Sequence, residues 1–256
     1  MRARTAFLSL AIAAGLAAGL GYVLLDHGFL RFNYPAPEQY PVRGIDISHH
    51  QGAIDWTLLE RQGVQFVYMK ASEGATMRDD QFLDNWAGSR KAGLAPGAYH
   101  YYSFCAPPLL QAQNFLDSAP PSPYPALPPA VDLEYAGNCQ QRPSSDQFEK
   151  DVRTFLDAVE GAWNRRAVLY VTDDFYAFAQ QRFPDNPVWV RSIYAHPSKA
   201  GFDHWRIWQY ANRGRLDGVG TVVDLNVFRG SRADFRLFIE PQRPADPIMP
   251  PKDPHR

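Results

Sequence analysis

The sequence contains only two cysteines in 256 residues, and neither belongs to a CxxC motif or to a Cys/His group at zinc-ligand spacing. A structural zinc site is therefore not expected. Runs of basic residues are also missing, and the 26 basic and 27 acidic residues leave a formal net charge of −1. This balance argues against nucleic acid as the main partner, because such a partner requires a basic patch.

The seven histidines lack the pattern of a metal-dependent sugar deacetylase, which needs closely spaced ligands. No HxxxH pair occurs, and the adjacent His49 and His50 are expected on opposite faces of a strand, where they cannot share an ion. We therefore expect no metal and no cofactor. A Mg²⁺ site made of carboxylates alone stays open as an alternative.

The first thirty residues, 1–30, form a separate unit that is predicted to be a signal-anchor. Arg2 and Arg4 precede 21 residues, 5–25, that include no charged side chain. In a helix this stretch spans about 31 Å, enough to cross a bilayer core. Apolar residues continue past the small residues that would mark a cleavage site, so we favour an inner-membrane anchor over secretion after cleavage. The basic flank places the rest of the chain outside the membrane, and both versions mean export.

Residues 42–238 are expected to form one catalytic barrel domain, between a Pro-containing linker at 31–41 and a Pro-rich tail at 239–256. Strand-like and helix-like segments alternate five times in this region, and three strand-like segments follow without a convincing helix between them. This order predicts an α/β fold, an irregular TIM-like barrel of five β/α units plus three further strands. The expected strands of the five units lie at 43–48, 64–71, 97–104, 129–135 and 167–172.

Two of the expected helices carry capping residues at their starts. The clearest helix, 144–164, has apolar residues at helical spacing and begins with Ser144, which forms a capping-box pattern with Gln147. Asp55 opens a short helix at 55–63 and is expected to cap it rather than to act in catalysis.

Four acidic residues lie within apolar, strand-like segments. Asp132 and Glu134 are two positions apart in "PPAVDLEYAG", so their side chains point to the same face of a strand. Asp46 in "RGIDISHH" and Asp224 in "GTVVDLNVF" occupy similar places. Because barrel enzymes carry their reactive groups at the C-terminal ends of strands, we expect all four acids at one mouth.

Four acids in one cleft, in a chain with 14% aromatic residues, fit hydrolysis of a glycosidic bond. That reaction needs one protonated carboxyl group to donate to the leaving oxygen and one ionised group to stabilise positive charge or to activate water. We assign the proton donor to Glu134, whose longer side chain reaches further into a cleft, and expect Asp132 to stay ionised beside it. Neighbouring negative charges raise the pKa of such a donor.

Cys105 and Cys139 each follow a strand-like segment, so both are expected in loops just beyond strand ends. In an oxidising compartment they are expected to form a disulfide bond. Two unpaired thiols stay open as the alternative.

Five separated motifs carry a resemblance to a known family: "GIDISHHQGAIDW", "FVYMKASEGATMRDDQF", "GLAPGAYHYYSF", "AVDLEY" and "WQYANRGRLDGVGTVVDLNVF". Over roughly residues 42–230 the chain resembles the glycoside hydrolase family 25 lysozymes, muramidases of the Chalaropsis type. The resemblance implies an irregular barrel of five β/α units and three further strands. It also implies cleavage of the β-1,4 bond between N-acetylmuramic acid and N-acetylglucosamine in peptidoglycan, without a metal.

Residue by residue, the resemblance implies that Glu134 is the proton donor, Asp132 its partner acid, and Asp46 and Asp224 the other two acids of the site. Whether Asp132 activates water, attacks directly or orients the substrate's acetamido group stays open. The family-like segments also imply five substrate-binding positions: Lys70, Glu73, Tyr99, Trp189 and Gln209.

Three of these five positions have an equally good structural interpretation. Lys70 and Glu73 can form a salt bridge that braces the second strand, and Trp189 can belong to the core. The chain also departs from the family pattern, with His50 where another residue, often an aromatic, is usual, and with the bulkier Arg191 in "WVRSIY". Such changes can alter the shape of the groove or its preference for sugar decoration.

The sequence thus predicts an exported, membrane-anchored muramidase that acts as a monomer on peptidoglycan glycan strands. Two alternatives from other classes stay open. One is a non-catalytic peptidoglycan-binding protein on the same barrel, and the other is a metal-dependent carbohydrate hydrolase.

Overall fold

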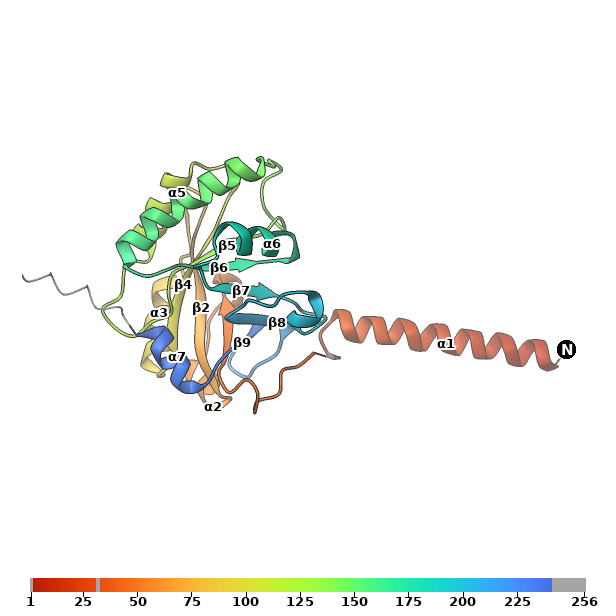
Figure 1. Ribbon diagram of the computed structural model, residues 1–256. Coiled ribbons are helices and arrows are strands. Elements are labelled where there is room, and N and C mark those ends of the chain that lie inside the picture. The colour runs from red at the N-terminus through yellow and green to blue at the C-terminus, as the bar shows by residue number, and fades with distance from the viewer. Residues whose placement is uncertain (1, 31–32, 241–256) are drawn as a thin grey trace, which may run out of the picture.

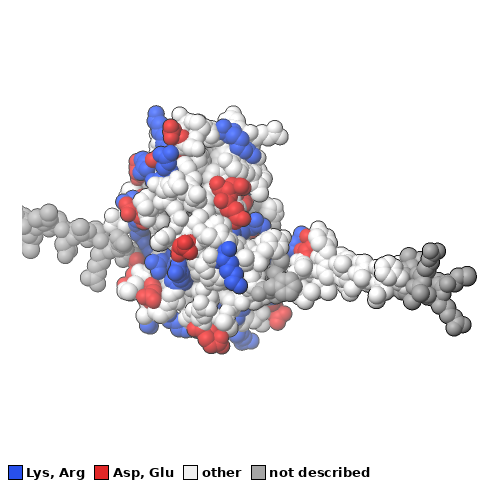
Figure 2. Space-filling model, turned by 45° about the vertical axis from the view of Figure 1, so that its right-hand side comes forward, with Lys and Arg blue, Asp and Glu red and all other residues white. Residues whose placement is uncertain are grey.

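The computed structural model describes residues 2–30 and 33–240 and consists of a long N-terminal helix joined to a barrel (Figure 1). The helix, α1 (Arg2–Asp26), projects away from the barrel, and Figure 2 shows no charged side chain along most of its described length. Within residues 2–30 and 33–240, no helix combines the length and the hydropathy needed to cross a membrane. Residues 31–32 of the expected linker and 241–256 of the expected tail lie outside the described residues.

Eight strands close into a barrel, because β1 pairs with both β2 and β9. A ninth, short strand adds to the edge of β2 by antiparallel pairing. The predicted α/β barrel is confirmed. Its strands are β1 (Arg43–Ile47), β2 (Val64–Glu73), the additional β3 (Met77–Arg78), β4 (Ala95–Tyr101), β5 (Ala130–Leu133), β6 (Val168–Val171), β7 (Val188–Arg191), β8 (Ile207–Gly214) and β9 (Val223–Phe228).

Five helices follow the strands that open the barrel, so the five predicted β/α units are present. They are α2 (Trp56–Arg61), α3 (Phe82–Lys91), α4 (Pro108–Ser118), α5 (Ser145–Trp163) and α6 (Asp173–Arg182). Between β7 and β8 the chain forms only a short 3-10 helix, η2 (Pro197–Ala200), and β8 is followed directly by β9. The last three strands therefore complete the barrel without α-helices between them.

The direction of β9 corrects one expectation about Asp224. Apart from the short β3, the strands β1, β2 and β4 to β8 pair in parallel with one another, but β9 runs antiparallel to both β8 and β1. Asp224 is the second residue of β9 and so lies at its N-terminal end, not at a C-terminal end as expected. Because β9 is reversed, this end opens on the same mouth as the C-terminal ends of the other strands, and Asp224 pairs in register with Asp46.

The helix starts agree with the capping residues in the sequence, with one difference. The Asp55 side chain accepts hydrogen bonds from the backbone N–H groups of Thr57 and Leu58 at the start of α2. Ser144 likewise accepts from the N–H of Gln147 at the start of α5. The expected capping box is only half formed, because the Gln147 amide donates to Asp151 one turn further along the helix.

Two apolar clusters stabilise the barrel. One fills the space between the strands and the surrounding helices, and the other fills the barrel interior. In the interior cluster, Phe235 of α7 (Arg232–Ile239) contacts the rings of Phe66 and Phe228 at centroid distances of 5.6 and 5.2 Å. Phe66 lies near the start of β2 and Phe228 ends the reversed β9, so α7 covers the end of the barrel opposite the acids. The other end is left to polar side chains.

Candidate active site

A cavity of about 200 Å³ opens where the parallel strands end, and all four sequence-predicted acids line it. Of the five expected substrate-binding residues, all but Glu73 also line the cavity. The side chains come from every strand of the closed barrel, so segments far apart in the sequence converge as expected. The lining residues are Asp46, Ser48, His50, Lys70, Tyr99, Tyr101, Asp132, Glu134, Tyr170, Trp189, Gln209 and Asp224.

Asp46 is the acid that receives most hydrogen bonds. Its two carboxylate oxygens accept from Gln209 Nε2 at 3.2 and 3.0 Å, and Oδ2 also accepts from Asn226 Nδ2 at 2.6 Å. Burial raises the pKa of Asp46, and these hydrogen bonds to its ionised form act in the opposite direction. Gln209 in turn accepts a hydrogen bond from Tyr170 Oη at 3.1 Å. Gln209 is thus engaged in orienting Asp46.

Asp224 lies opposite Asp46 on the neighbouring strand. Burial raises the pKa of Asp224 well above its usual range, and the negative charge of Asp46 raises it further. Two close carboxyl groups in a buried site cannot easily ionise together. Burial and the charge of Asp46 thus favour the protonated form of Asp224, while the amide neighbours of Asp46 favour its ionised form.

In the described part of the chain, Asp132 lacks the hydrogen bonds that would hold its carboxyl group ionised, as the expected partner of Glu134 should be. Its side chain is buried, and Oδ1 has no hydrogen-bond partner among the described residues. Burial raises the pKa of Asp132 well above its usual range, and the charges of Glu134 and Asp46 add to the effect. Burial and these charges thus favour the protonated form of Asp132, although we expected an ionised partner. The charges of Lys70 and Arg191 act in the opposite direction.

Glu134 follows directly after β5 and is less buried than Asp132. Burial raises the pKa of Glu134, and the charge of Asp46 raises it further, whereas Arg191 and Lys70 lower it. A raised pKa is what a carboxyl group needs in order to donate a proton near neutral pH. The direction therefore agrees with the expected proton donor.

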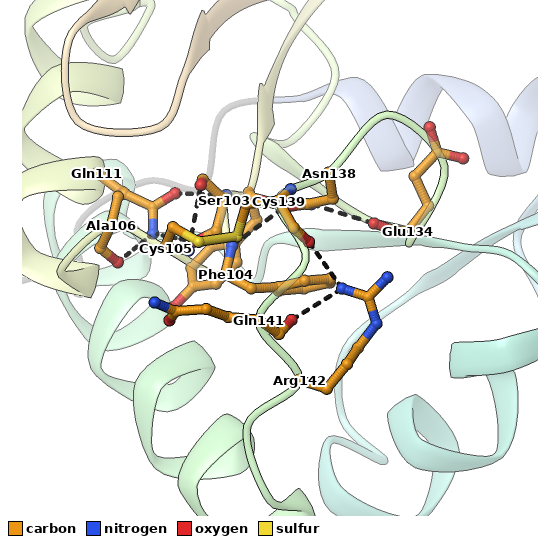
Figure 3. The surroundings of a disulfide bond; sticks show 11 residues. Ser103, Phe104, Cys105, Ala106, Gln111, Glu134, Asn138, Cys139, Gln141 and Arg142 are labelled. Atoms are coloured by element: carbon orange, nitrogen blue, oxygen red, sulfur yellow. Dashed lines mark hydrogen bonds between the residues drawn. A yellow bond between two sulfur atoms is a disulfide. The ribbon is translucent and has the colours of Figure 1, made fainter.

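The predicted disulfide bond, between Cys105 and Cys139, fixes the loop that follows Glu134 (Figure 3). Within this loop Asn138 Nδ2 donates to the backbone oxygens of Tyr102 and Glu134 at 2.7 and 3.1 Å. Figure 3 shows the Glu134 side chain directed away from the disulfide. The crosslink and Asn138 therefore position the backbone of Glu134 and leave its carboxyl group free to face the cavity.

Aromatic rings form the floor of the cavity. Trp189 is only 2% exposed, its ring stacks on Tyr68 at 4.8 Å, and its Nε1 donates to Asn226 Oδ1 at 2.8 Å. The ring of Tyr99 meets Trp189 edge to face at 6.4 Å. Trp189 is thus both a core residue and a residue that lines the cavity. The two interpretations of Trp189 that the sequence left open, core and sugar groove, are therefore compatible.

Lys70 and Glu73 form the salt bridge that was one interpretation of the pair, and Lys70 also lines the cavity, as the other interpretation predicted. Lys70 Nζ lies 2.5 Å from Glu73 Oε2, and it lies 4.9 Å from the centre of the Tyr101 ring. Only Lys70 of this ion pair lines the cavity. The ion pair therefore braces the end of β2 and holds a cation beside the acids.

Four lining or supporting residues were not predicted from the sequence: Ser48, Tyr101, Tyr170 and Asn226. Asn226 is two positions after Asp224 on the same strand face, so the alternation of β9 could have identified it. Tyr170 lies on β6 beside Asp132, and Tyr101 ends β4. No signal in the sequence marks these two tyrosines as different from core aromatics.

The interpretation of the adjacent histidines was wrong. His49 and His50 lie in a 3-10 helix, η1 (His49–Gln51), and not on a strand, so their rings contact each other at 4.0 Å. The reason is that Ser48 caps η1 and ends the extended backbone. His49 is held by Asp79 through Nδ1 at 3.0 Å, and only His50 lines the cavity. Among the described residues, no group of three or more His, Cys, Asp or Glu side chains is arranged to hold a metal ion.

A barrel that gathers four carboxyl groups at one mouth, with the pKa of each raised, has the acid–base groups of a glycoside hydrolase. Comparison with known families agrees with this class. The model of the glycosyl hydrolases family 25 matches residues 45–219, and the chain belongs to that family.

Individual relatives cover most of the chain. An uncharacterized protein YegX from Escherichia coli O157:H7 is 34% identical over 211 residues, 80% of this chain and 75% of that protein. Lysozyme M1 from Streptomyces globisporus is 32% identical, over 75% of this chain and 69% of its own length. Among solved structures, a family 25 glycosyl hydrolase from Bacillus anthracis superposes with a TM-score of 0.75 at 31% identity. The match covers 82% of this chain and 99% of that one.

Proposed function

We propose that this protein is a muramidase that cleaves the β-1,4 bond between N-acetylmuramic acid and N-acetylglucosamine in peptidoglycan. The observation that carries the proposal is the convergence of Asp46, Asp132, Glu134 and Asp224 on one cavity. Similarity to lysozyme M1, to an autolytic lysozyme from Clostridium acetobutylicum and to an N,O-diacetylmuramidase from Arthroderma benhamiae supports the choice of substrate.

Glu134 is the proposed general acid. It donates its proton to the glycosidic oxygen as the bond to the sugar carbon breaks, and it is then available as a base for the incoming water. Its raised pKa and its partial exposure at the cavity support this role.

Asp132 is proposed to hold the acetamido group of the substrate. Its unpartnered Oδ1 is a buried acceptor, and the N–H of a 2-acetamido group is a donor of suitable chemistry. That hydrogen bond favours the ionised form of Asp132 and turns the amide oxygen towards the sugar carbon, where it attacks as an internal nucleophile. Water then opens the resulting ring, and no covalent bond to the enzyme forms.

The remaining residues are proposed to shape and charge the subsite. Asp46, oriented by Gln209, supplies negative charge against the cationic sugar, and Asp224 holds the proton that the pair shares. Tyr99 and Trp189 offer ring surface to the sugar, while Lys70, braced by Glu73, offers a donor.

The Glu134→Gln variant tests the assignment most directly. It keeps the size and the backbone hydrogen bond of Glu134 but has no proton to donate, so release of reducing ends from purified peptidoglycan should fall at least about 100-fold. Mass spectrometry of the soluble products should show a reducing muramic acid at the new end. A wild-type rate for Glu134→Gln contradicts the assignment, and a protein that binds glycan without ever shortening it is a binding protein instead. Loss of activity with a chelator would point to a metal-dependent hydrolase.

We also propose that the chain is exported and stays tethered to the inner membrane. The support is the uncharged stretch at 5–25 behind Arg2 and Arg4, together with a disulfide that suits an oxidising compartment. Carbonate extraction of membranes from cells that express the full chain should leave it in the pellet. A shortened chain in the soluble exported fraction would contradict the proposed membrane tether but would still agree with export.

A further inference from the structure

Arg191 is a cation at the mouth of the acidic cavity. It is the last residue of β7 and pairs in register with Gln209 of β8. Trp189, two positions earlier on the same strand, lines the cavity, and residues two apart on a strand share a face. The Arg191 side chain is therefore expected on the same face as Trp189, beyond the residues that line the cavity, where it is half-buried and close enough to act on the charge of Glu134.

The guanidinium of Arg191 forms no ion pair within residues 2–30 and 33–240, although four carboxyl groups line the adjacent cavity. The other cation of the cavity, Lys70, is already paired with Glu73. Arg191 thus carries five hydrogen-bond donors in a fixed planar fork that suits a carboxylate, and its charge is unpaired.

The position of Arg191 works against the acid chemistry of the site. Its charge lowers the pKa of Asp46, Asp132, Glu134 and Asp224, although a general acid benefits from a raised pKa. This effect disappears if an anion from the substrate neutralises the guanidinium. A bound carboxylate would therefore raise the pKa of Glu134 when the substrate is in place.

We propose that Arg191 is a specificity residue that binds a carboxylate on the 3-O-lactyl arm of muramic acid, an inference that rests on the proposed muramidase function. The carboxylate is either the free lactyl group of a peptide-free strand or the first carboxylate of an attached peptide. Both offer the planar, two-oxygen acceptor that an arginine binds through two parallel hydrogen bonds.

The test compares three substrates with the full chain: peptide-free glycan strands, the same strands with the lactyl carboxyl converted to a carboxamide, and strands that keep their peptides. If the lactyl carboxylate is the ligand, the wild type should prefer the first over the second by about tenfold in kcat/KM. If the peptide carboxylate is the ligand, the preference should appear only with the third. Arg191→Gln should abolish the preference, mainly through KM, and Arg191→Lys should restore part of it.

The pH profile separates specificity from a structural role. On the carboxamide substrate, the basic limb of the wild-type kcat profile should lie at lower pH than on the carboxylate, because Arg191 stays unneutralised and lowers the pKa of Glu134. Arg191→Gln should remove this difference. Arg206→Gln, at an exposed arginine just before β8 and distant from the mouth, is the matched control and should change neither readout.

Equal loss on all three substrates in Arg191→Gln would overturn the proposal. A wild type that prefers neither the carboxylate strands nor the peptide-bearing strands over the carboxamide strands would overturn it too. If Arg191→Gln fails to fold, the wild-type comparison of the three substrates still decides. No product from any substrate with the wild type would instead contradict the muramidase function itself.

Discussion

The amide of Asn226 joins the acid site to the barrel floor: its Nδ2 donates to Asp46 Oδ2 at 2.6 Å, and its Oδ1 accepts from Trp189 Nε1 at 2.8 Å. Asn226 is completely buried. One side chain therefore fixes both the orientation of a charged acid and the position of the aromatic floor.

Replacing Asn226 with alanine should impair both functions. Asp46 loses its shortest hydrogen bond, the Trp189 donor is left unpaired, and a void forms. We expect the free energy of unfolding to fall by about 2 to 4 kcal/mol and kcat/KM to fall at least tenfold. Urea unfolding and peptidoglycan hydrolysis measure the two effects. Full activity in Asn226→Ala would show that the orientation of Asp46 is not needed for hydrolysis. Gln141→Ala, in an exposed loop, serves as the control.

Removing the disulfide should loosen the loop that positions Glu134. The crosslink joins residues 34 positions apart, and the loss of such a loop closure costs about 3 to 4 kcal/mol. The double variant Cys105→Ser, Cys139→Ser should therefore unfold at a lower temperature, with reduced kcat. Reductant should shift the wild type in the same direction and leave the double variant unchanged. If reductant does not change the unfolding temperature of the wild type, the disulfide does not stabilise the protein as predicted.

Asp132→Asn should stabilise the protein while reducing its activity. The pKa of Asp132 is raised in the folded chain, so this group favours folding while protonated, and that contribution is lost as the pH rises through the folded pKa. At pH 7 the amide avoids the cost of a buried charge, and we expect a gain of about 0.5 to 2 kcal/mol. The gain should vanish at acidic pH. Thermal unfolding over a range of pH measures this gain in stability. Asp80→Asn, at an exposed position, is the control. A loss of stability in Asp132→Asn at pH 7 would contradict the prediction.

Two glycine-to-alanine changes should have opposite effects. At Gly97 in β4, an added Cβ would lie 2.6 Å from the Tyr68 ring, so Gly97→Ala should cost about 1 to 3 kcal/mol through overpacking. At Gly161 in α5, an added Cβ meets no atom within 4 Å, and Gly161→Ala should add about 0.5 to 1 kcal/mol of helix stability. Denaturant midpoints compare the two directly. Similar shifts for both would mean that the contact at Tyr68 is relieved at little cost.

The sequence predicts the order of strands and helices well, because apolar periodicity and the capping residues Asp55 and Ser144 act locally. It also predicts the four acids, because a charged residue in an apolar strand is conspicuous. What it does not predict depends on pairing between distant segments. The reversal of β9 brings Asp224 to the mouth from its N-terminal side. The role of Gln209 as a partner of Asp46 appears only when β8 and β1 pair with the two edges of β9.

The pairing of β1 with β9 also has a consequence for the timing of synthesis. The first and last strands of the barrel are neighbours, and the register that closes the barrel sets Asp46 opposite Asp224. Contacts so distant in sequence form late, because the whole intervening chain must be ordered first. A nascent chain that has emerged only as far as β8 lacks both the seam and the second acid of that pair. If Asp224 has its proposed role, the site of an enzyme directed at the cell wall cannot assemble until the last strand has been made.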